Sequence, residues 1–190
     1  MSKDTPIDDP ELVKRLRDSS TCRTAFGEVI ARYSEPLYWQ IRRMVEDHDD
    51  ANDLLQNTFM KAWSSIENFR GEAKLSTWLY KIATNEVLRF IEKHKQTMVA
   101  LDDLERQYAY EVQDSGSDDD TAEQLVWLQK AIRHLPEKQR LVFNLRYYDE
   151  LEYAEISEIL NTQVETLKTN FHYAKENIKK YIQKNYYERL

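Results

Sequence analysis

Residues 151–184 read LEYAEISEILNTQVETLKTNFHYAKENIKKYIQK, and this stretch decides what kind of fold the chain adopts. Tyr153–Leu160 has the length and spacing of a short helix, and the polar residues 161–163 interrupt the pattern. Val164 then begins a longer helical pattern that continues to about Lys184. Two helices joined by so short a break, the second rich in cations, are typical of a helix-turn-helix.

The long helix of this pair carries a polar face that could contact nucleic acid. Lysines supply charge for phosphates, and short polar side chains can reach base edges. This face consists of Thr166, Lys168, Thr169, Asn170, His172 and Lys175, and Lys179, Lys180 and Lys184 extend its basic end. Because the charged face of an isolated helix is usually only solvated, the helix pattern alone leaves that alternative open.

Two further helices are expected before this pair. Thr121 can cap a helix that reaches His134, and Pro136 stands where a proline opens the next helix. The apolar residues of that second helix are Leu141, Val142, Leu145 and Tyr148. Residues 122–190 are therefore expected to form one small helical domain.

An acidic segment separates this domain from the rest of the chain. Between Asp102 and Glu123 there are nine acidic residues against Arg106, a local charge of −8, and Ser115–Ser117 lie among them. Because the segment has no long apolar periodicity, residues 97–121 are expected to be a flexible linker. The net charge of −7 argues at first against nucleic acid, but without this segment it becomes +1.

Residues 21–96 predict a second small helical domain, after an N-terminal extension of residues 1–20. Thr21–Asp47 is expected to form a helical pair, because Ser34 can cap a new helix with Pro36 in its first turn. The core candidates of this pair are Phe26, Ile30, Leu37, Trp39 and Ile41.

Two more helices are expected in this domain, from about Asp49 to Ile66 and from Leu75 to Lys95, with a turn at Phe69–Lys74 between them. Their apolar stripes consist of Leu55, Phe59, Ala62 and Ile66 in the first and of Leu79, Ala83, Val87 and Ile91 in the second. Together the two domains predict an all-α fold, which agrees with only three glycines and four prolines in the chain.

Each of these two helices also has a polar face. On the second, a stripe at spacings of four, three, four and four could face DNA, and it consists of Trp78, Ile82, Asn85, Arg89 and Lys93. Alternatively, Trp78 packs in the core and Arg89 only pairs with Glu86 or Glu92. On the first helix, Asp53, Gln56 and Met60 share a face that could meet a protein partner.

The chain lacks the patterns of several other protein classes. It has no phosphate loop, no Glu-x-x-His pair and no nucleophile flanked by motif glycines, so no catalytic, metal or cofactor site is expected. The single cysteine, Cys22, excludes an internal disulfide. No apolar run approaches about 18 residues, and residues 1–10 do not resemble a signal peptide, so a cytoplasmic protein is expected.

Three segments resemble one known family. DANDLLQNTFMKAW (50–63) and FRGEAKLSTWLYKIATN (69–85) resemble domain 2 of the extracytoplasmic-function group of the sigma-70 family. LPEKQRLVFNLRYY (135–148), followed by the helix-turn-helix, resembles domain 4. The resemblance covers roughly residues 26–182 and implies a sigma factor, which binds RNA polymerase core and directs it to promoters.

The resemblance also implies roles for single residues. Asp53, Gln56 and Asn57 would dock on the clamp helices of the polymerase's largest subunit. The turn at Phe69–Lys74 and the helix after it would melt the minus-10 element and hold a flipped base. The minus-10 residues would be Phe69, Arg70, Lys74, Trp78, Asn85, Arg89 and Lys93, and the minus-35 residues Thr166, Lys168, Thr169, Asn170, His172 and Lys175.

Further partners follow from the same resemblance. The chain would also bind the polymerase flap, the acidic linker would thread toward the active-site channel, and an anti-sigma factor, often membrane-anchored, would control the monomeric protein. Asn170, Phe171 and Tyr173 stand where many relatives carry arginines, which implies weak affinity for DNA without polymerase. Two other functions stay open: a dimeric helix-turn-helix regulator of operators, and a helical adaptor whose acidic linker folds on a partner.

Overall fold

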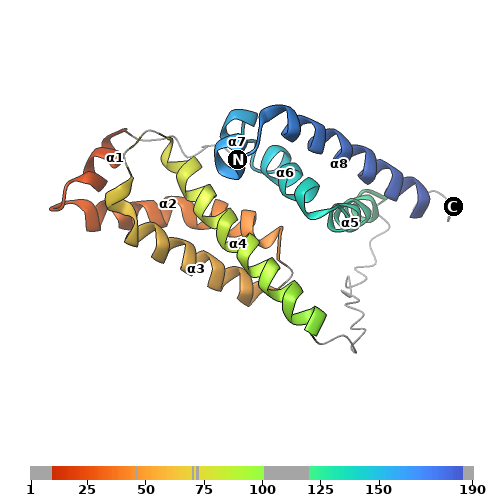
Figure 1. Ribbon diagram of the computed structural model, residues 1–190, viewed down its shortest axis with the longest axis horizontal. Helices are drawn as coiled ribbons and strands as arrows, with labels where there is room; N and C mark the ends of the chain where they lie inside the picture. The colour runs from red at the N-terminus through yellow and green to blue at the C-terminus, as the bar shows by residue number, and fades with distance from the viewer. Residues whose placement is uncertain (1–9, 46, 70, 72, 101–119, 186–190) are drawn as a thin grey trace.

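The regular structure is entirely helical in the described part of the computed structural model, which comprises residues 10–45, 47–69, 71, 73–100 and 120–185. This confirms the predicted all-α fold (Figure 1). The elements in chain order are α1 (Pro10–Arg17), α2 (Cys22–Arg42), α3 (His48–Ser64), the short 3-10 helix η1 (Ile66–Asn68), α4 (Leu75–Ala100), α5 (Asp120–Arg133), α6 (Glu137–Tyr147), α7 (Tyr153–Leu160) and α8 (Val164–Asn185). Most of the expected linker, residues 101–119, lies outside the described residues.

The N-terminal domain is built from α2, α3 and α4, which pack on one another, with α1 against α2 and η1. Of the predicted core residues, nine are buried: Phe26, Leu37, Ile41, Phe59, Ala62, Ile66, Leu79, Ala83 and Val87. Leu55 and Ile91 are partly buried. The α1 helix adds Leu12 and Leu16, which are almost fully buried in the same core.

The expected helical pair at residues 21–47 is wrong, because α2 is one continuous helix with Pro36 inside it. The Ser34 hydroxyl donates to the Ile30 carbonyl at 2.6 Å, one turn back, and so does not cap a new helix. In the continuous helix, the buried stripe runs through Val29, Tyr33 and Leu37. Ile30 lies off this stripe and is 40% exposed, as Trp39 is at 51%, so neither belongs to the core as predicted.

The C-terminal domain packs α8 against α5, α6 and α7. The α7 helix ends at Leu160 and α8 begins at Val164, which confirms the predicted helix-turn-helix. Asn161 adopts the left-handed conformation that ends α7, and Glu152 and Glu155 form a capping box at its start. Leu167, Ala174 and Ile178 form the buried face of α8.

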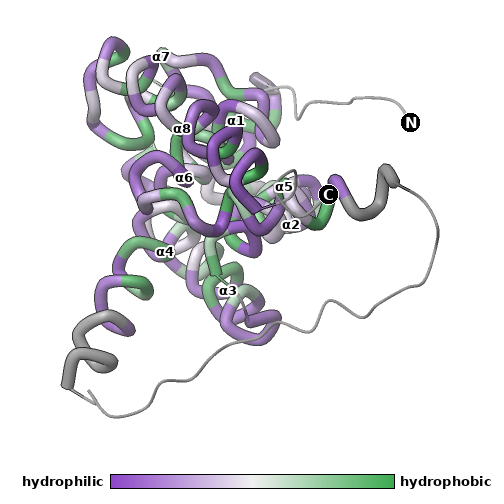
Figure 2. Tube along the Cα trace, turned by 90° about the vertical axis from the view of Figure 1, so that its right-hand side faces the viewer, coloured by the Kyte–Doolittle hydropathy of each residue, from purple (hydrophilic) through white to green (hydrophobic). Residues whose placement is uncertain are grey.

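The two domains lie against each other, in what we call the closed arrangement. The α7 helix packs on α4, and buried residues of both domains, among them Leu79 of α4 and Ile156 of α7, belong to one continuous apolar cluster. In the turned view of Figure 2, the labels of α3 and α4 stand on one side of the molecule and those of α7 and α8 on the other. The packing of α7 on α4 therefore joins two domains that lie on either side of the expected linker in the sequence.

Candidate protein- and nucleic-acid-binding surfaces

The α3 helix presents an open polar face, which we call the α3 face. Asp53, Gln56 and Asn57 lie within one turn of each other on it, and all three are exposed. Met60 continues this face by one turn and is 64% exposed. The opposite side of α3 is held in the core, so the rigid domain fixes where the polar side chains point. The α3 face stays accessible in the closed arrangement.

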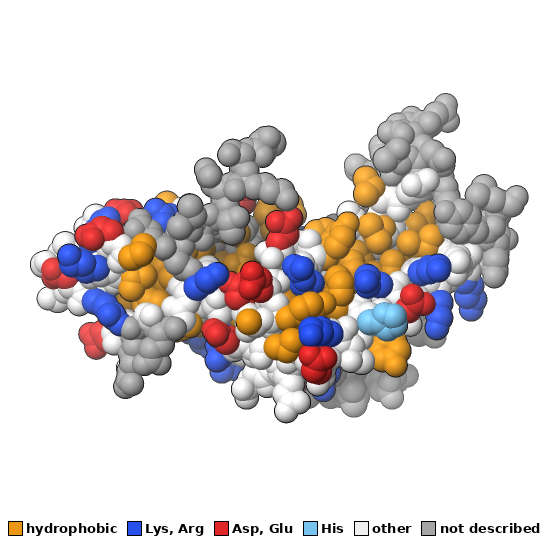
Figure 3. Space-filling view, turned by 90° about the horizontal axis from the view of Figure 1, so that it is seen from above, with side chains coloured by type: hydrophobic (Ala, Val, Ile, Leu, Met, Phe, Trp, Pro, Cys, Tyr) orange, Lys and Arg blue, Asp and Glu red, His pale blue; other side chains and the backbone are white. Residues whose placement is uncertain are grey.

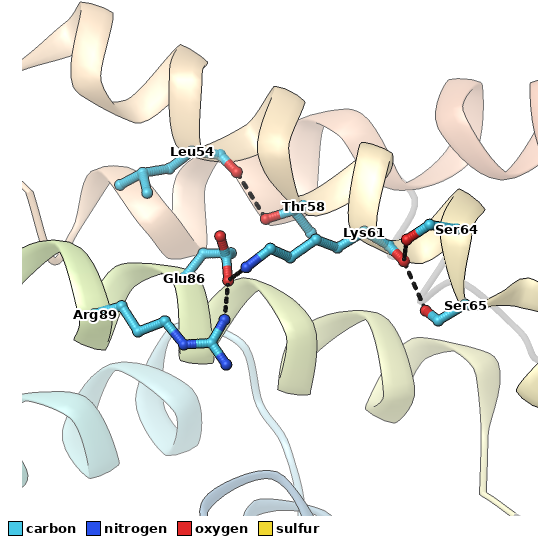
Figure 4. Close-up of polar contacts among 7 residues, drawn as sticks. All are labelled: Leu54, Thr58, Lys61, Ser64, Ser65, Glu86 and Arg89. Carbon is cyan, nitrogen blue, oxygen red and sulfur yellow. Dashed lines mark hydrogen bonds and ion pairs between the residues drawn. The ribbon is translucent and has the colours of Figure 1, made fainter.

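A shared carboxylate connects α3 to α4 (Figure 4). One oxygen of Glu86, a residue only 8% exposed, accepts hydrogen bonds from Lys61 of α3 at 2.5 Å and from Arg89 of α4 at 2.7 Å. The pairing of Arg89 with Glu86 was one of the two readings that the sequence left open. The Arg89 side chain nevertheless remains 66% exposed, so it can also meet a ligand.

The other residues expected at the minus-10 element divide into two groups. Asn85 and Lys93 of α4 are exposed like Arg89, and Lys74 precedes the helix. Phe69, by contrast, is buried, and its ring lies 4.9 Å from the ring of the partly buried Trp78. Arg70 lies outside the described residues. Asn85, Arg89 and Lys93 thus form an outward polar row along α4, and Phe69 and Trp78 pack together near the start of this helix.

The α8 helix exposes the polar face expected at the minus-35 element. Thr166, Lys168, Thr169, His172 and Lys175 are exposed, and Asn170 is partly buried. Figure 3 looks onto this side of the molecule and shows cationic side chains along it. Lys168 pairs with Glu165 at 2.8 Å, which raises the pKa of the ammonium group.

Two aromatic residues of α8 differ in their placement. Phe171 points inward and stacks on Phe143, with 5.8 Å between ring centroids. Tyr173 is 54% exposed and lies beside His172. Of these two residues, Tyr173 therefore adds its ring to the outer face, and Phe171 adds its ring to the core.

Polar contacts that no sequence pattern predicted join the two domains. Arg43, just after α2, pairs with Asp149, just after α6, and lies 4.9 Å above the ring of Tyr148. Lys74 pairs with Glu155 of α7 at 2.9 Å. One residue expected at the minus-10 element is thus engaged by the C-terminal domain in the closed arrangement.

Asp149 should make the closed arrangement depend on pH. Burial raises the pKa of this carboxyl to about 6, from an ordinary 3.8, and outweighs the opposing effect of Arg43. Tyr80 of α4 and Tyr148 are titratable groups that also lie near this pair. Since the pKa is raised in the closed state, protonation favours closure: the stabilisation is complete below pH 3.8 and is lost as the pH rises through 6.

Lowering the pH from 7.5 to 5 should therefore raise the ratio of closed to open molecules about tenfold, which corresponds to a free-energy difference of about 1.4 kcal/mol. Energy transfer between dyes on α3 and α8 measures this ratio. The Asp149→Asn variant, which cannot titrate there, is the control and should show a flat profile. An equally flat wild-type profile would contradict the assignment.

Comparison with known proteins agrees with the two-domain division. Residues 29–97 match the family model described as sigma-70 region 2, and residues 125–178 match the model described as sigma-70 region 4. The chain is 35% identical over 164 residues to the ECF RNA polymerase sigma factor SigW of Bacillus subtilis, covering 82% of this chain and 88% of the relative. It is 31% identical over 188 residues to the ECF RNA polymerase sigma-E factor of Haemophilus influenzae, covering 93% and 96%.

Solved structures share the fold. The structure of CnrH in complex with the cytosolic domain of CnrY is similar with a TM-score of 0.67 and 19% identity, over 94% of this chain and 99% of that one. The sigma factor RpoE in complex with the anti-sigma factor NepR from Bartonella quintana gives a TM-score of 0.66 and 22% identity, over 84% and 98%. Among the described residues, no helix has the length and apolar character needed to cross a membrane.

Proposed function

This chain belongs to the extracytoplasmic-function group of the sigma-70 family. From that premise we propose which of its surfaces binds the polymerase and which bind the two promoter elements. It is an RNA polymerase sigma factor, a DNA-binding initiation factor and not an enzyme. An operator-binding regulator or an adaptor would leave the region 2 match unexplained. The observation that carries the proposal is that α3, α4 and α8 each hold one face in a core and expose an opposite polar face.

We assign the α3 face, with Asp53, Gln56 and Asn57, to docking on the clamp helices of the polymerase. A carboxylate and two amides on a rigid helix suit a partner that offers cations and backbone groups. The face needs no rearrangement of the closed arrangement, because all three side chains are already exposed. Docking can therefore precede the separation of the domains. The C-terminal domain would then bind the flap.

We assign the start of α4 and its outward row to the minus-10 element. Arg89, Lys93 and Lys74 supply cations for phosphates, and Asn85 can hydrogen-bond to a base. Trp78, whose ring is tilted against that of Phe69, offers an aromatic ring on which an unpaired base can lie. Arg70, beside this pair in the sequence, would add a further cation. Contact through Lys74 requires release of its pair with Glu155, and hence opening of the domains.

We assign the exposed face of α8 to the major groove of the minus-35 element. Lys168 and Lys175 would contact phosphates, while Thr166, Thr169, Asn170 and His172 would lie nearer to base edges. The helix is positioned for this role by its apolar face, which is fixed in the core of the C-terminal domain.

The solved relatives named above are complexes, one with an anti-sigma factor, and we propose that an anti-sigma factor, of the membrane-anchored kind, also binds this chain. The domain boundaries proposed are 21–96 and 122–190, with residues 97–121 as the connector through the polymerase. We propose that the protein acts as a monomer in the cytoplasm, where its polymerase and promoters are.

Run-off transcription with purified core polymerase and a genomic promoter library tests the proposal. The protein should yield discrete transcripts that core alone does not. Lys175→Gln should lower the yield from all promoters about three- to tenfold at moderate salt and reduce the salt dependence by about one charge, because it removes one phosphate contact. Lys14→Gln, an equal charge loss on α1, is the control. No loss with Lys175→Gln would contradict the assignment of α8.

A further inference from the structure

The exposed surface of α8 carries two rows of side chains that differ in charge. Residues three, four or seven positions apart on a helix lie on one side of it. One row is cationic and consists of Lys168, Lys175 and Lys179. The other row is uncharged and consists of Thr166, Thr169 and Tyr173, all of them exposed. The two rows therefore offer DNA different contacts.

Two carboxylates lie between these rows. Glu165 and Glu176, both exposed, each neighbour a residue of both rows at helical spacing. Because carboxylates repel phosphates, the middle of this face would be turned to the bases and not to the sugar-phosphate backbone when α8 lies in the groove. The cationic row would then meet the phosphates of one strand. The uncharged row, which offers no cation to the other strand, would lie nearer to the base edges.

Tyr173 and Thr169 present apolar groups one turn apart in the uncharged row. The Thr169 hydroxyl donates to the Glu165 carbonyl at 2.9 Å, so its hydrogen is used inside the helix and its methyl group is left for a contact. The side chain of Tyr173 is 54% exposed, and the edge of its ring meets His172 with 5.7 Å between ring centroids. This contact limits the directions in which the exposed ring can turn.

An apolar pair of this kind matches one base in the major groove. Among the four bases, thymine presents an apolar group there, its C5-methyl. Guanine is read through two acceptors, which call for the paired donors of an arginine, and adenine through an acceptor and a donor, which suit an amide. A phenol ring and a threonine methyl group supply neither pair of hydrogen bonds, but they can cover a methyl group.

We propose that Tyr173, together with the methyl group of Thr169, selects a thymine in the minus-35 element by contact with its C5-methyl group. This inference rests on the proposed function, because it requires α8 to lie in the major groove. It separates two properties of the helix. The cationic row sets the affinity for all promoters alike, whereas Tyr173 sets the preference among them.

Replacing the thymines of the minus-35 element one at a time with deoxyuridine, which lacks only the methyl group, tests this inference. Promoters obtained from the run-off library are labelled and titrated with the holoenzyme, and fluorescence anisotropy gives the affinity. At one position the wild type should bind the deoxyuridine duplex about three- to fivefold more weakly. Tyr173→Ala should remove that difference, and Tyr173→Phe, which retains the ring, should keep it. Tyr147→Ala removes a ring that is 55% exposed on α6 and should behave like the wild type.

An equal effect of deoxyuridine on the wild type and on Tyr173→Ala at every thymine would overturn the inference. So would promoters whose minus-35 elements share no thymine. A Tyr173→Phe variant as insensitive to the methyl group as Tyr173→Ala would also contradict it, because the hydroxyl and not the ring would then make the contact. Failure of the proposed function gives a different result: Lys175→Gln would not weaken binding, and no base change in the minus-35 element would alter the affinity.

Discussion

The double substitution Asp53→Lys with Gln56→Ala should abolish promoter-specific transcription by weakening the binding of core polymerase about hundredfold, or nearly 3 kcal/mol. The first change places a cation where the partner is expected to offer cations, and like charges across an interface are strongly unfavourable. The second removes an amide from the same face. Both side chains are exposed, so the fold should be retained.

Fluorescence anisotropy of the labelled protein titrated with core measures this loss directly, and run-off transcription measures its consequence. Glu35→Lys makes the same charge change at an exposed position of α2 and should bind core like the wild type. If the double variant keeps its affinity for core, the α3 face is not the docking surface. If it binds core normally but fails to transcribe, the face acts at a later step, which also contradicts the assignment.

Replacing Arg43 with methionine should separate the domains at pH 7.5. The substitution retains the apolar stem but leaves Asp149 buried beside α6 without its cation. Breaking a buried pair in this way costs about 3–5 kcal/mol, and the partial exposure of Arg43 places the cost near the lower limit. Opening should appear as a larger radius of gyration in X-ray scattering and as weaker energy transfer between α3 and α8.

Acidification provides an internal check on that result. Once protonated, Asp149 no longer needs a cation, so the Arg43→Met variant should close again near pH 5. Adding Asp149→Asn should restore closure at pH 7.5 as well, because the amide carries no charge. A variant that stays closed at pH 7.5, with an unchanged melting temperature, would show that apolar packing of α7 on α4 alone holds the domains together.

The sequence predicted the helices and their outward faces because both follow from the 3.6-residue period. Leu79, Ala83 and Val87 are buried and Asn85 and Arg89 are exposed for the same geometric reason. The period misled in α2, where local signals competed with it. Ser34 and Pro36 together resemble a helix start, yet the apolar stripe of α2 continues through them and packing prevails.

Contacts between the domains could not be predicted in this way. Arg43 and Asp149 are 106 positions apart, and neither belongs to a repeating pattern that marks a partner. In the sequence, each of the two residues is a single charge outside the helical patterns, and the fold alone makes them neighbours.

The carboxylate of Glu86 gives the N-terminal domain a reciprocal thermodynamic linkage. One oxygen holds both Lys61, on the helix assigned to polymerase docking, and Arg89, on the helix assigned to DNA. A polymerase group that attracts Lys61 leaves Arg89 as the sole cation on that oxygen, and a phosphate that attracts Arg89 does the converse. Through this oxygen, binding of polymerase changes the free energy of DNA binding, and binding of DNA changes the free energy of polymerase binding by the same amount.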